Sequence, residues 1–476
     1  MLLSDVIEGL TGYKIEAPQS ISQVVIDSRE AGPGSLFVAL PGEQTDGHHY
    51  VAHAFQNGAS AAITDRPVPA VPPSQTIEAV HFDPTQPLPA GPVCLQVDHS
   101  LAGLQALARF WRQKFQPRVI GVTGSVGKST TKELLWNVLA TRFNTLKSEG
   151  NYNNEIGLPL TLLKLNETHE RVVLEMGMYD LGEIKLLCQL AQPQIGVVTI
   201  VGPVHLERLG TIERIAQAKA ELVQALPSDG VAILNYDDER VRQMAALTQA
   251  RVMTYGLSPQ ADLWGDQVVS AGLEGVRFVF HYGGEEIHAK IPMLGRHSVH
   301  TALRAALVGL VEGLAWEDII SGLQSLPRSA QLRLVSVKGP NQSTILDDTY
   351  NASPPSTLAA LNLLDDLSAT KKIAVLGEMM ELGSYEEEGH RKVGCRAADV
   401  VDQLIVIGPL TRYIVAEAKA CGLAEDQILE LDSNQAAIAY LRQTLAPGNL
   451  VLIKASLSRR MGEIVAALSV QNGETQ

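Results

Sequence analysis

The decapeptide Gly121-Val-Thr-Gly-Ser-Val-Gly-Lys-Ser-Thr130 ends an apolar run, residues 119–122, and opens an amphipathic helical pattern. The apolar residues that share one face of this helix are Leu134, Leu135, Val138 and Leu139. A strand, a glycine-rich turn and a helix in this order are typical of a mostly parallel sheet with crossover helices. The decapeptide therefore predicts an α/β fold.

The same decapeptide resembles a phosphate-binding loop in composition. Gly124 and Gly127 allow backbone N–H groups to close around phosphate oxygens, and Lys128 can reach the terminal phosphates. The strict motif has a glycine where this chain has Val122, so the loop is a variant form. A turn that binds nothing is disfavoured, because Gly-Lys-Ser-Thr opens a helix directly after a strand. We predict a nucleoside triphosphate site formed by Gly124, Ser125, Gly127, Lys128, Ser129 and Thr130, with the Ser129 hydroxyl available to Mg²⁺.

The whole chain has the composition of an ordinary soluble globular protein, with 45% hydrophobic and 19% charged residues among 476. This length exceeds what one hydrophobic core supports, and we expect about three domains. The net charge of −14 disfavours binding to nucleic acid or to an anionic membrane surface. Because we recognise neither a signal peptide nor an apolar run long enough to span a bilayer, we expect a cytoplasmic protein without membrane insertion. Nothing in the sequence demands more than a monomer.

The cysteines are scattered at Cys94, Cys188, Cys395 and Cys421 and form no C-x-x-C pair. This spacing predicts neither a disulfide framework nor a zinc site. We expect buried or inert thiols.

The pattern changes along the chain, and we predict a domain for each segment. Residues 1–97 combine short β-like runs with loops, and the proline-rich stretch 67–92 reads as surface connection. In residues 98–327 apolar strands alternate with amphipathic helices, and a Gly-Gly pair at 283–284 indicates a hairpin. Residues 328–476 repeat the alternation, which predicts a second, doubly wound domain of the Rossmann type. The expected strands are residues 24–26, 36–40, 61–63, 119–122, 172–175, 196–200, 231–234, 276–282, 285–291, 344–346, 373–376, 404–407 and 450–453.

A lysine interrupts the apolar face of a helix that we expect to begin after the N-cap Thr211. Lys219 lies among the apolar residues of that face, Ile212, Ile215, Ala216, Leu222, Val223 and Leu226. A buried ammonium is costly, so such a lysine either extends its amine to solvent or lowers its pKa. The pattern alone favours extension to solvent. A deprotonated amine can instead react with CO₂, and the resulting carbamate could help to bind Mg²⁺.

Two further polar residues follow predicted strands. Glu175 ends the run 172–175, and His205 follows the run 196–200. Both can project over the carboxyl edge of the sheet, where α/β folds bind ligands. With Ser129 and Lys219 they form a candidate magnesium site. A lone histidine is more often a loop or core residue and is an uncommon Mg²⁺ ligand, so this prediction depends on their joint location.

Motifs spread over nearly the full length resemble those of the Mur ligase family. In the first half they are Asp27-Ser-Arg29, Gly34-Ser-Leu-Phe-Val-Ala-Leu-Pro-Gly42, Asp46-Gly-His48, Gly150-Asn-Tyr-Asn-Asn-Glu-Ile-Gly157, Glu175-Met-Gly177, His205 and Ala218-Lys-Ala-Glu221. In the second half they are Gly295-Arg-His297, Asp347-Asp-Thr-Tyr-Asn351, Val375-Leu-Gly-Glu-Met-Met-Glu-Leu-Gly383, His390-Arg391 and Lys454-Ala-Ser456. Their order along the chain carries the resemblance.

The resemblance implies an ATP- and Mg²⁺-dependent ligase with a UDP-precursor-binding domain, a central ATP-binding domain and a C-terminal Rossmann-like domain. It further implies ligation of D-alanyl-D-alanine to UDP-N-acetylmuramoyl-tripeptide through an acyl phosphate, a step of peptidoglycan synthesis. The implied catalytic residues are Lys128, Glu175, His205 and Lys219, and the implied metal ligands are Ser129, Glu175, His205 and a carbamylated Lys219. The implied additional nucleotide contacts are Arg296, Asp347 and Asp348. The implied substrate-binding residues are Ser28, Arg29, Gly47, His48, Asn153, Asn154, Glu155, Asn351, Lys454 and Ser456.

The chain also departs from the family's patterns. Such ligases commonly show Gly-Arg-His-Asn-Val-x-Asn, whereas this chain has Ser298 and Thr301 at the two amide positions. Ala330-Gln331 stands where the family has Gly-Arg, and Lys454-Ala-Ser456 where it has Lys-Gly-Ser. These changes bear on recognition of the adenine and of the substrate.

Alternative functions stay open from the sequence. A ligase of the same family that adds a single amino acid is expected to lack the Asn153-Asn-Glu155 run, which is present. A non-catalytic scaffold is expected to lose one of the implied catalytic residues, and all are present. A switch of the GTPase kind is expected to carry guanine-specific motifs after the loop, and we recognise none.

Overall fold

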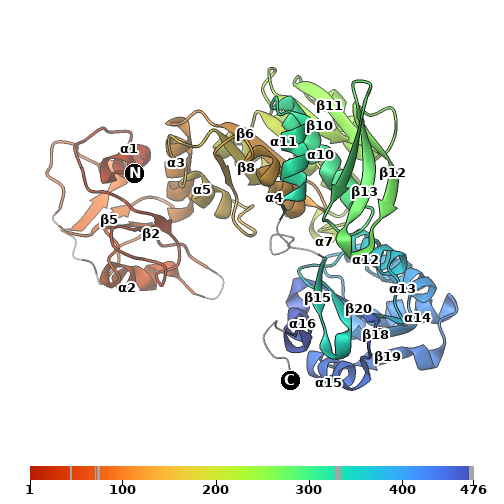
Figure 1. Cartoon of the computed structure of the whole chain (residues 1–476). Helices are drawn as coiled ribbons and strands as arrows, with labels where there is room; N and C mark the ends of the chain where they lie inside the picture. The colour runs from red at the N-terminus through yellow and green to blue at the C-terminus, as the bar shows by residue number, and fades with distance from the viewer. Residues whose placement is uncertain (43–44, 70, 72–74, 90, 327–333, 471–476) are drawn as a thin grey trace. The chain divides into compact units, whose positions relative to one another are not determined.

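The computed structural model describes residues 1–42, 45–69, 71, 75–89, 91–326 and 334–470 (Figure 1). The chain packs as two compact units. The first comprises Met1–Ile120, Asn144–Met176 and Lys185–Pro193, and the second comprises Gly121–Phe143, Gly177–Ile184 and Gln194–Gln476. The predicted domain boundaries after residues 97 and 327 stay predictions, and the second of them lies outside the described residues, as does Gln331.

The first unit contains a five-stranded parallel sheet with the order β1-β2-β3-β5-β4. Its strands are β1 (Val24–Val25), β2 (Leu36–Val38), β3 (Ala61–Thr64), β4 (Thr76–Glu78) and β5 (Val93–Gln96), and its helices are α1 (Leu3–Thr11), α2 (Val51–Gln56) and α3 (Ser100–Gln113). The expectation that residues 67–92 only connect elements at the surface is wrong at β4. The side chain of Ile77 is buried there, and the strand pairs with β5, because the prolines flank the strand and leave its N–H groups in place.

The first unit also holds β7 (Thr145–Lys147) and β8 (Arg171–Glu175), which pair in parallel. Helix α5 (Gly157–Leu162) lies between them in sequence, and helix α6 (Glu183–Ala191) follows them. Strand β8 ends at Glu175, as the sequence predicts. Strand β6 (Arg118–Thr123) precedes the glycine-rich loop.

The central part of the second unit alternates strands and helices. The strands β9 to β12 are parallel neighbours, and β13 and β14 extend them in antiparallel fashion. These strands are β9 (Ile195–Val198), β10 (Val231–Asn235), β11 (Arg251–Gly256), β12 (Leu263–Ser270), β13 (Val276–Tyr282) and β14 (Glu285–Ile291). The helices are α4 (Lys128–Leu139), α7 (Leu206–Leu209), α8 (Ile212–Gln224), α9 (Glu239–Gln243), α10 (Ser298–Val311) and α11 (Trp316–Gln324). The Gly283-Gly284 hairpin is confirmed, with both glycines at positive φ.

The C-terminal part of the second unit is a six-stranded sheet with the order β15-β16-β20-β17-β18-β19, parallel except for β15. The strands are β15 (Val335–Lys338), β16 (Thr344–Asp348), β17 (Lys371–Gly377), β18 (Gln403–Ile407), β19 (Ile428–Leu431) and β20 (Asn449–Lys454). The helices are α12 (Pro354–Asp366), α13 (Glu386–Val400), α14 (Arg412–Ala420), α15 (Asn434–Thr444) and α16 (Gly462–Leu468).

Both faces of this sheet are covered, which confirms the doubly wound prediction. In β17, Ala374 and Leu376 pack with α12, α13 and α14, whereas Ile373 and Val375 pack with α15 and α16 on the other face. Because both faces are buried, each strand reads as a continuous apolar run.

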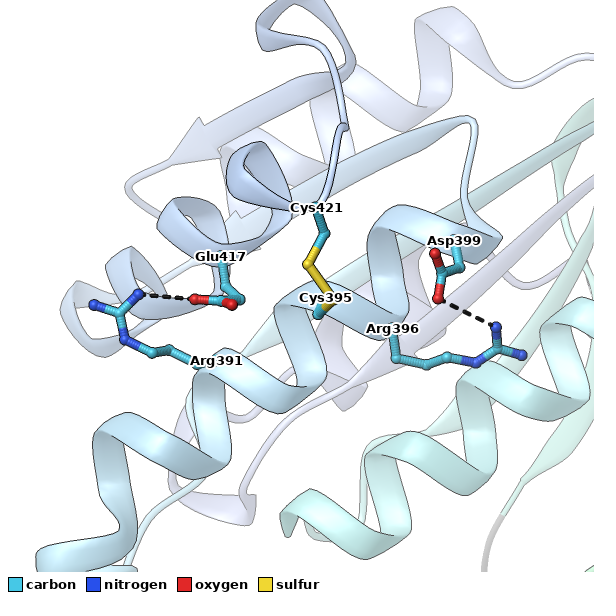
Figure 2. The surroundings of a disulfide bond; sticks show 6 residues. All are labelled: Arg391, Cys395, Arg396, Asp399, Glu417 and Cys421. Atoms are coloured by element: carbon cyan, nitrogen blue, oxygen red, sulfur yellow. Dashed lines mark hydrogen bonds and ion pairs between the residues drawn. A yellow bond between two sulfur atoms is a disulfide. The ribbon is translucent and has the colours of Figure 1, made fainter.

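Two cysteines form a disulfide bond, so the prediction of inert thiols is wrong for Cys395 and Cys421. Cys395 lies in α13 and Cys421 directly follows α14, and their Cα atoms are 5.3 Å apart (Figure 2). A Cβ at Gly394 would collide with the carbonyl oxygen of Ile414, so this glycine allows the two helices to approach closely. An ion pair of 2.9 Å between Arg391 and Glu417 joins the same helices. Cys94 and Cys188 are buried and take no part in a disulfide bond, as expected.

Within the described residues, no helix combines the length and the hydrophobicity needed to cross a bilayer.

Candidate functional site

The glycine-rich loop is fixed against the end of β9. The N–H of Ser125 donates to the carbonyl of Ile200 at 2.7 Å, and the Thr199 hydroxyl donates to the carbonyl of Val126 at 2.6 Å. A Cβ at Gly124, whose φ is +145°, would collide with Oγ1 of Thr199. Glycine is therefore required at this position, where the backbone packs directly against its neighbour.

The loop leads into α4 as the sequence predicts. Gly127 caps the helix in the left-handed conformation, with φ +85°. Nζ of Lys128 donates to the carbonyl of Gly124 at 2.8 Å, which holds the ammonium over the loop. All four predicted apolar positions of α4 are fully buried. Backbone N–H groups, a helix N-terminus and an ammonium together suit a phosphate group.

A cavity of about 320 Å³ opens beside the loop. Its lining residues are Val126, Gly127, Thr130, Thr199, Ile200, Asn235, Met293, Leu294, His297, Ser298, His300, Thr301, Arg304, Leu334, Asp348, Pro355, Ser356 and Ala359. Most of this wall is apolar, and the phosphate loop supplies one edge of it. A flat organic group attached to a phosphate chain fits such a site.

Of the three additional nucleotide contacts implied by the family resemblance, one lines the cavity and two lie away from it. Asp348 lines the cavity and is buried. Asp347, which precedes Asp348 in β16, points to the opposite face. It accepts hydrogen bonds from the N–H and hydroxyl of Thr349 at 3.0 and 2.7 Å. Arg296 does not line the cavity, and its exposed guanidinium contacts Asp366 at 3.3 Å. Adjacent residues of a strand face opposite sides, so only one aspartate can reach the cavity.

Lys219 is buried, with 2% of its surface exposed, so extension of its amine to solvent is wrong. The expected N-cap is confirmed, because the Thr211 hydroxyl accepts the N–H of Arg214 at 3.2 Å. Burial lowers the pKa of Lys219 well below its ordinary value, and the nearby ammonium of Lys128 lowers it further. Both effects shift the equilibrium of this side chain toward its neutral amine.

His205 lies close to the same two lysines. Burial lowers the pKa of this imidazole, Lys128 and Lys219 lower it further, and Glu381 acts in the opposite direction. Its Nδ1 atom is 2.5 Å from Oε2 of Glu381, a close ion pair that lacks hydrogen-bond geometry. Both residues have positive φ, +55° for His205 and +65° for Glu381, a conformation that costs energy for non-glycine residues. Lys128, Lys219 and His205 thus form a basic cluster, in which the ammonium of Lys128 favours a nearby anion.

Glu175 is the predicted metal ligand that belongs to the first unit. It is 2% exposed, and its Oε1 atom accepts the side-chain N–H of Asn153 at 2.8 Å. Its Oε2 atom is buried without a hydrogen-bond partner among the described residues. A buried carboxylate oxygen without a partner is costly, and a bound cation is one way to satisfy it. Its grouping with Ser129, His205 and Lys219 stays a prediction.

The remaining residues of the Asn153–Glu155 run have structural contacts. The side-chain oxygen of Asn154 accepts the N–H groups of Ile156 and Gly157 at 3.3 and 2.9 Å, where α5 begins. The carbonyl of Glu155 accepts the side chain of Gln105 at 3.1 Å.

The predicted substrate residues near the N-terminus form two small clusters. In one, the buried Ser28 hydroxyl lies 3.0 Å from Nδ1 of His53, and Arg29 pairs with Asp27. This pairing lowers the pKa of Asp27 to about 2. In the other cluster, buried His48 lies between two carboxylates: Nδ1 is 2.7 Å from Asp46 and Nε2 is 3.0 Å from Asp65. Aspartate side chains thus fix the positions of both the exposed Arg29 and the buried His48.

Gly47 precedes His48 and packs against another backbone segment. A Cβ at this position would lie 2.7 Å from the backbone nitrogen of Leu40, so no larger residue fits without a shift.

In the C-terminal part, Lys454 ends β20 and is 1% exposed. Its Nζ atom lies 2.5 Å from Oδ2 of Asp348 and 2.9 Å from the carbonyl of Asn351. Ser456 accepts the N–H of Met380 at 2.9 Å. These contacts connect the ends of β16 and β20 with the loop that carries Glu381.

Replacing Lys454 by methionine is expected to destabilise the protein by about 3 kcal/mol, because the buried Asp348 loses this counter-charge. Urea unfolding of the purified protein measures the loss. The double replacement Lys454→Met with Asp348→Leu serves as the control and should recover part of the stability. A single variant as stable as the unmodified protein would contradict the ion pair.

Arg304, Glu381 and His53 contact residues of the candidate site but were not singled out from the sequence. Arg304 could have been found by the signal that marked Lys219, since it is a charged residue inside the apolar helix α10. Glu381 lies in the motif Val375–Gly383 but was given no role, and no local signal marks His53, because the partners of both residues are distant in sequence. Among the described residues, no group of three or more His, Cys, Asp or Glu side chains could hold a metal ion by itself.

Comparison with known proteins gives matches over almost the whole chain. The family models that match are the Mur ligase family catalytic domain over residues 20–111, the Mur ligase middle domain over 122–309 and the Mur ligase glutamate ligase domain over 332–457. The UDP-N-acetylmuramoyl-tripeptide–D-alanyl-D-alanine ligase of Bacillus subtilis is 38% identical, over 94% of this chain and 93% of the relative. The ligase of the same name from Escherichia coli is 30% identical, over 99% and 98%.

Solved structures agree with these matches. The crystal structure of MurF from Acinetobacter baumannii superposes with a TM-score of 0.83 at 28% identity, over 97% of each chain. The MurF ligase from Thermotoga maritima in complex with ADP superposes with a TM-score of 0.78 at 29% identity, over 94% of this chain and 96% of that one. The α/β fold with Mur ligase domains is thereby confirmed. The chain belongs to the Mur ligase family and, within it, to the MurF group.

Proposed function

We propose that this protein joins D-alanyl-D-alanine to UDP-N-acetylmuramoyl-tripeptide at the expense of ATP, giving the pentapeptide precursor of peptidoglycan, ADP and phosphate. The observation that carries the proposal is the match to ligases of this activity over more than nine-tenths of both chains. The phosphate loop beside a mostly apolar cavity supports the use of ATP. Retention of Lys128, Glu175, His205 and Lys219 disfavours a scaffold without activity.

The reaction proceeds through an acyl phosphate. The terminal carboxylate of the tripeptide attacks the γ-phosphorus of ATP, and ADP leaves. The amine of D-alanyl-D-alanine then attacks the acyl carbon and loses a proton, and phosphate departs to leave the new amide bond. Lys128 and the N–H groups of the loop neutralise the charge that moves onto the phosphate oxygens.

Mg²⁺ is part of the proposal, held by Ser129, Glu175, His205 and Lys219. Bound there, it would supply positive charge that stabilises the phosphate groups during transfer. The donor set fits this ion: Glu175 has a buried carboxylate oxygen without a described partner, and Ser129 has a buried hydroxyl. Mg²⁺ prefers oxygen ligands, which a lysine lacks. The neutral amine of Lys219 can add CO₂ and release a proton, and the resulting carbamate supplies oxygens.

Other roles follow the same proposal. Gly124, Ser125, Gly127 and Thr130 bind the phosphates, and Asp348 faces the nucleotide from the cavity wall. Arg296 and Asp347 are left out, because both lie away from the cavity. The substrate-binding residues are Ser28, Arg29, Gly47, His48, Asn153, Asn154, Glu155, Asn351, Lys454 and Ser456. Domains of residues 1–97, 98–327 and 328–476, a monomeric state and a cytoplasmic location complete the proposal.

Phosphate release tests the function. The protein is incubated with ATP, Mg²⁺ and UDP-N-acetylmuramoyl-tripeptide, with either D-alanyl-D-alanine or single amino acids as acceptor. We expect release that depends on the dipeptide, with a UDP-linked pentapeptide detected by mass spectrometry. Release with a single amino acid alone would assign the protein to another ligase type, and no release with any acceptor would support the scaffold alternative.

A further inference from the structure

The cavity beside the phosphate loop contains a buried arginine. Arg304 is 5% exposed and lines the cavity from α10. Its Nη1 atom donates to the hydroxyl of Tyr255 at 3.2 Å, and its Nη2 atom donates to the hydroxyl of Thr301 at 2.6 Å. A Cβ added at Gly127 would lie 3.0 Å from Nη2, so the guanidinium rests against the phosphate loop.

The hydrogen-bonding capacity of Arg304 is only partly used. A guanidinium has five N–H donors, and two of them have the partners just named. The Nε atom is buried and has no hydrogen-bond partner within the described part of the chain. No described carboxylate forms an ion pair with Arg304. A buried charge with unused donors is costly, which indicates that a ligand with acceptor atoms completes it.

The position of Arg304 determines which part of a nucleotide it can meet. The phosphates belong at the loop, where Lys128 lies over Gly124. The cavity around Arg304 has apolar walls that suit the flat faces of a base, including Val126, Ile200, Met293, Leu294 and Pro355. Purines carry their acceptors at the ring edge, and both adenine and guanine have the N7 acceptor there.

We propose that Arg304 recognises the base of the bound nucleotide by donating to N7 of the purine and, where the base is guanine, to its 6-carbonyl as well. This inference rests on the proposed use of a nucleoside triphosphate. Arginine offers donors only, which match N7 and the 6-carbonyl of guanine together, whereas the 6-amine of adenine requires an acceptor. The nearby hydroxyl of Thr301 accepts from Arg304, and that of Ser298 donates to Leu294 at 2.6 Å. Arg304 by itself therefore does not select ATP over GTP.

A nucleotide that lacks the N7 acceptor tests the contact without altering the protein. We expect 7-deaza-ATP to have a KM about 10- to 100-fold higher than ATP in pentapeptide formation, because one hydrogen bond from a charged donor is lost. In Arg304→Leu this penalty should vanish, since the donor is absent. The kcat/KM for GTP should lie within about 10-fold of that for ATP in the unmodified protein. In Arg304→Leu the kcat/KM for GTP should fall, and this fall should be about 10- to 100-fold larger than the fall of kcat/KM for ATP.

Arg242→Leu is the matched control. Arg242 also packs on a tyrosine, with its guanidinium carbon 4.9 Å from the centre of the Tyr236 ring, but it is exposed and outside the cavity. This variant should keep the full 7-deaza penalty. An equal KM for ATP and 7-deaza-ATP in the unmodified protein would overturn the inference. A raised KM for 7-deaza-ATP that persists in Arg304→Leu would also overturn the inference. So would a kcat/KM for ATP more than roughly 1000-fold above that for GTP.

Two further outcomes stay distinguishable. Should Arg304→Leu fail to fold, the comparison of ATP, 7-deaza-ATP and GTP in the unmodified protein decides alone. Should no nucleotide support pentapeptide formation, the proposed function fails instead. Calorimetry with ADP and 7-deaza-ADP then still tests the base contact. A weaker affinity for 7-deaza-ADP would support the contact, and equal affinities would overturn it.

Discussion

Replacing Lys219 by methionine is expected to lower the turnover number by about a thousandfold, while the protein unfolds at the same or a higher temperature. Lys219 is buried, and no hydrogen bond or ion pair joins its amine to another described residue. Methionine has a similar length without the polar amine, so the fold loses a desolvation cost and keeps its packing. If the proposed carbamate holds Mg²⁺, the chemistry loses a metal ligand. Steady-state kinetics and thermal unfolding on the same preparation measure both effects.

The smaller replacement Lys219→Ala extends this test. It leaves room in which a short carboxylate such as formate can stand in for the carbamate, so added formate should restore part of the activity. Lys419→Met is the control, because Lys419 is an exposed lysine paired with Glu425 and lies outside the cavity and the basic cluster. A Lys219→Met variant with unchanged turnover would remove Lys219 from the mechanism. A variant that loses activity and stability together would indicate a structural role.

Lys128→Met is expected to reduce turnover by a similar factor, about a thousandfold, with a different signature. Lys128 is the ammonium held over the loop by the carbonyl of Gly124. Its removal takes away a positive charge that attracts the phosphates both in the bound ground state and during phosphoryl transfer. We therefore expect the dissociation constant of ADP to rise about 10- to 100-fold, whereas Lys219→Met should change it much less. Isothermal titration calorimetry separates the two variants.

The loss of Lys128 has a second expected effect, because its ammonium lowers the pKa of both Lys219 and His205. Without it, the pKa of each should move upward. A Lys128→Arg variant, which keeps the positive charge, is the control for this coupling. An ADP affinity that is equal in Lys128→Met and the unmodified protein would contradict the placement of the phosphates at the loop.

Much of the fold could be predicted from the sequence, because most strands of the parallel sheets are buried on both faces. Strands such as β10 and β17 appear as continuous apolar runs for this reason. Some of the strands that were missed are of another kind. In β12 buried and partly exposed residues mix around Gly265 and Asp266, and β19 at the sheet edge is only half buried. Neither produces a run that stands out from a loop.

The parts of the candidate site that could be predicted are those whose functional residues lie within one short segment of the sequence. The phosphate loop and Lys219 are signals within a few residues of sequence. The loop leads into α4 as expected, whereas Lys219 is buried and does not extend its amine to solvent. The contacts of Arg304 with Tyr255 and of His205 with Glu381 join residues far apart in the chain. The Cys395–Cys421 bond depends on the close packing of two helices. Such proximity arises from tertiary packing, which spacing in sequence does not encode.

The mostly apolar wall of the cavity also determines the heat capacity of nucleotide binding. Residues such as Met293, Leu294 and Pro355 lose contact with water when a base covers them. Removal of apolar surface from water lowers the heat capacity, so the binding enthalpy of ADP should become more exothermic as the temperature rises. Inorganic pyrophosphate, which reaches only the loop, should show almost none of this temperature dependence. The energetic contributions of the two halves of the site can thus be separated with a calorimeter and two ligands.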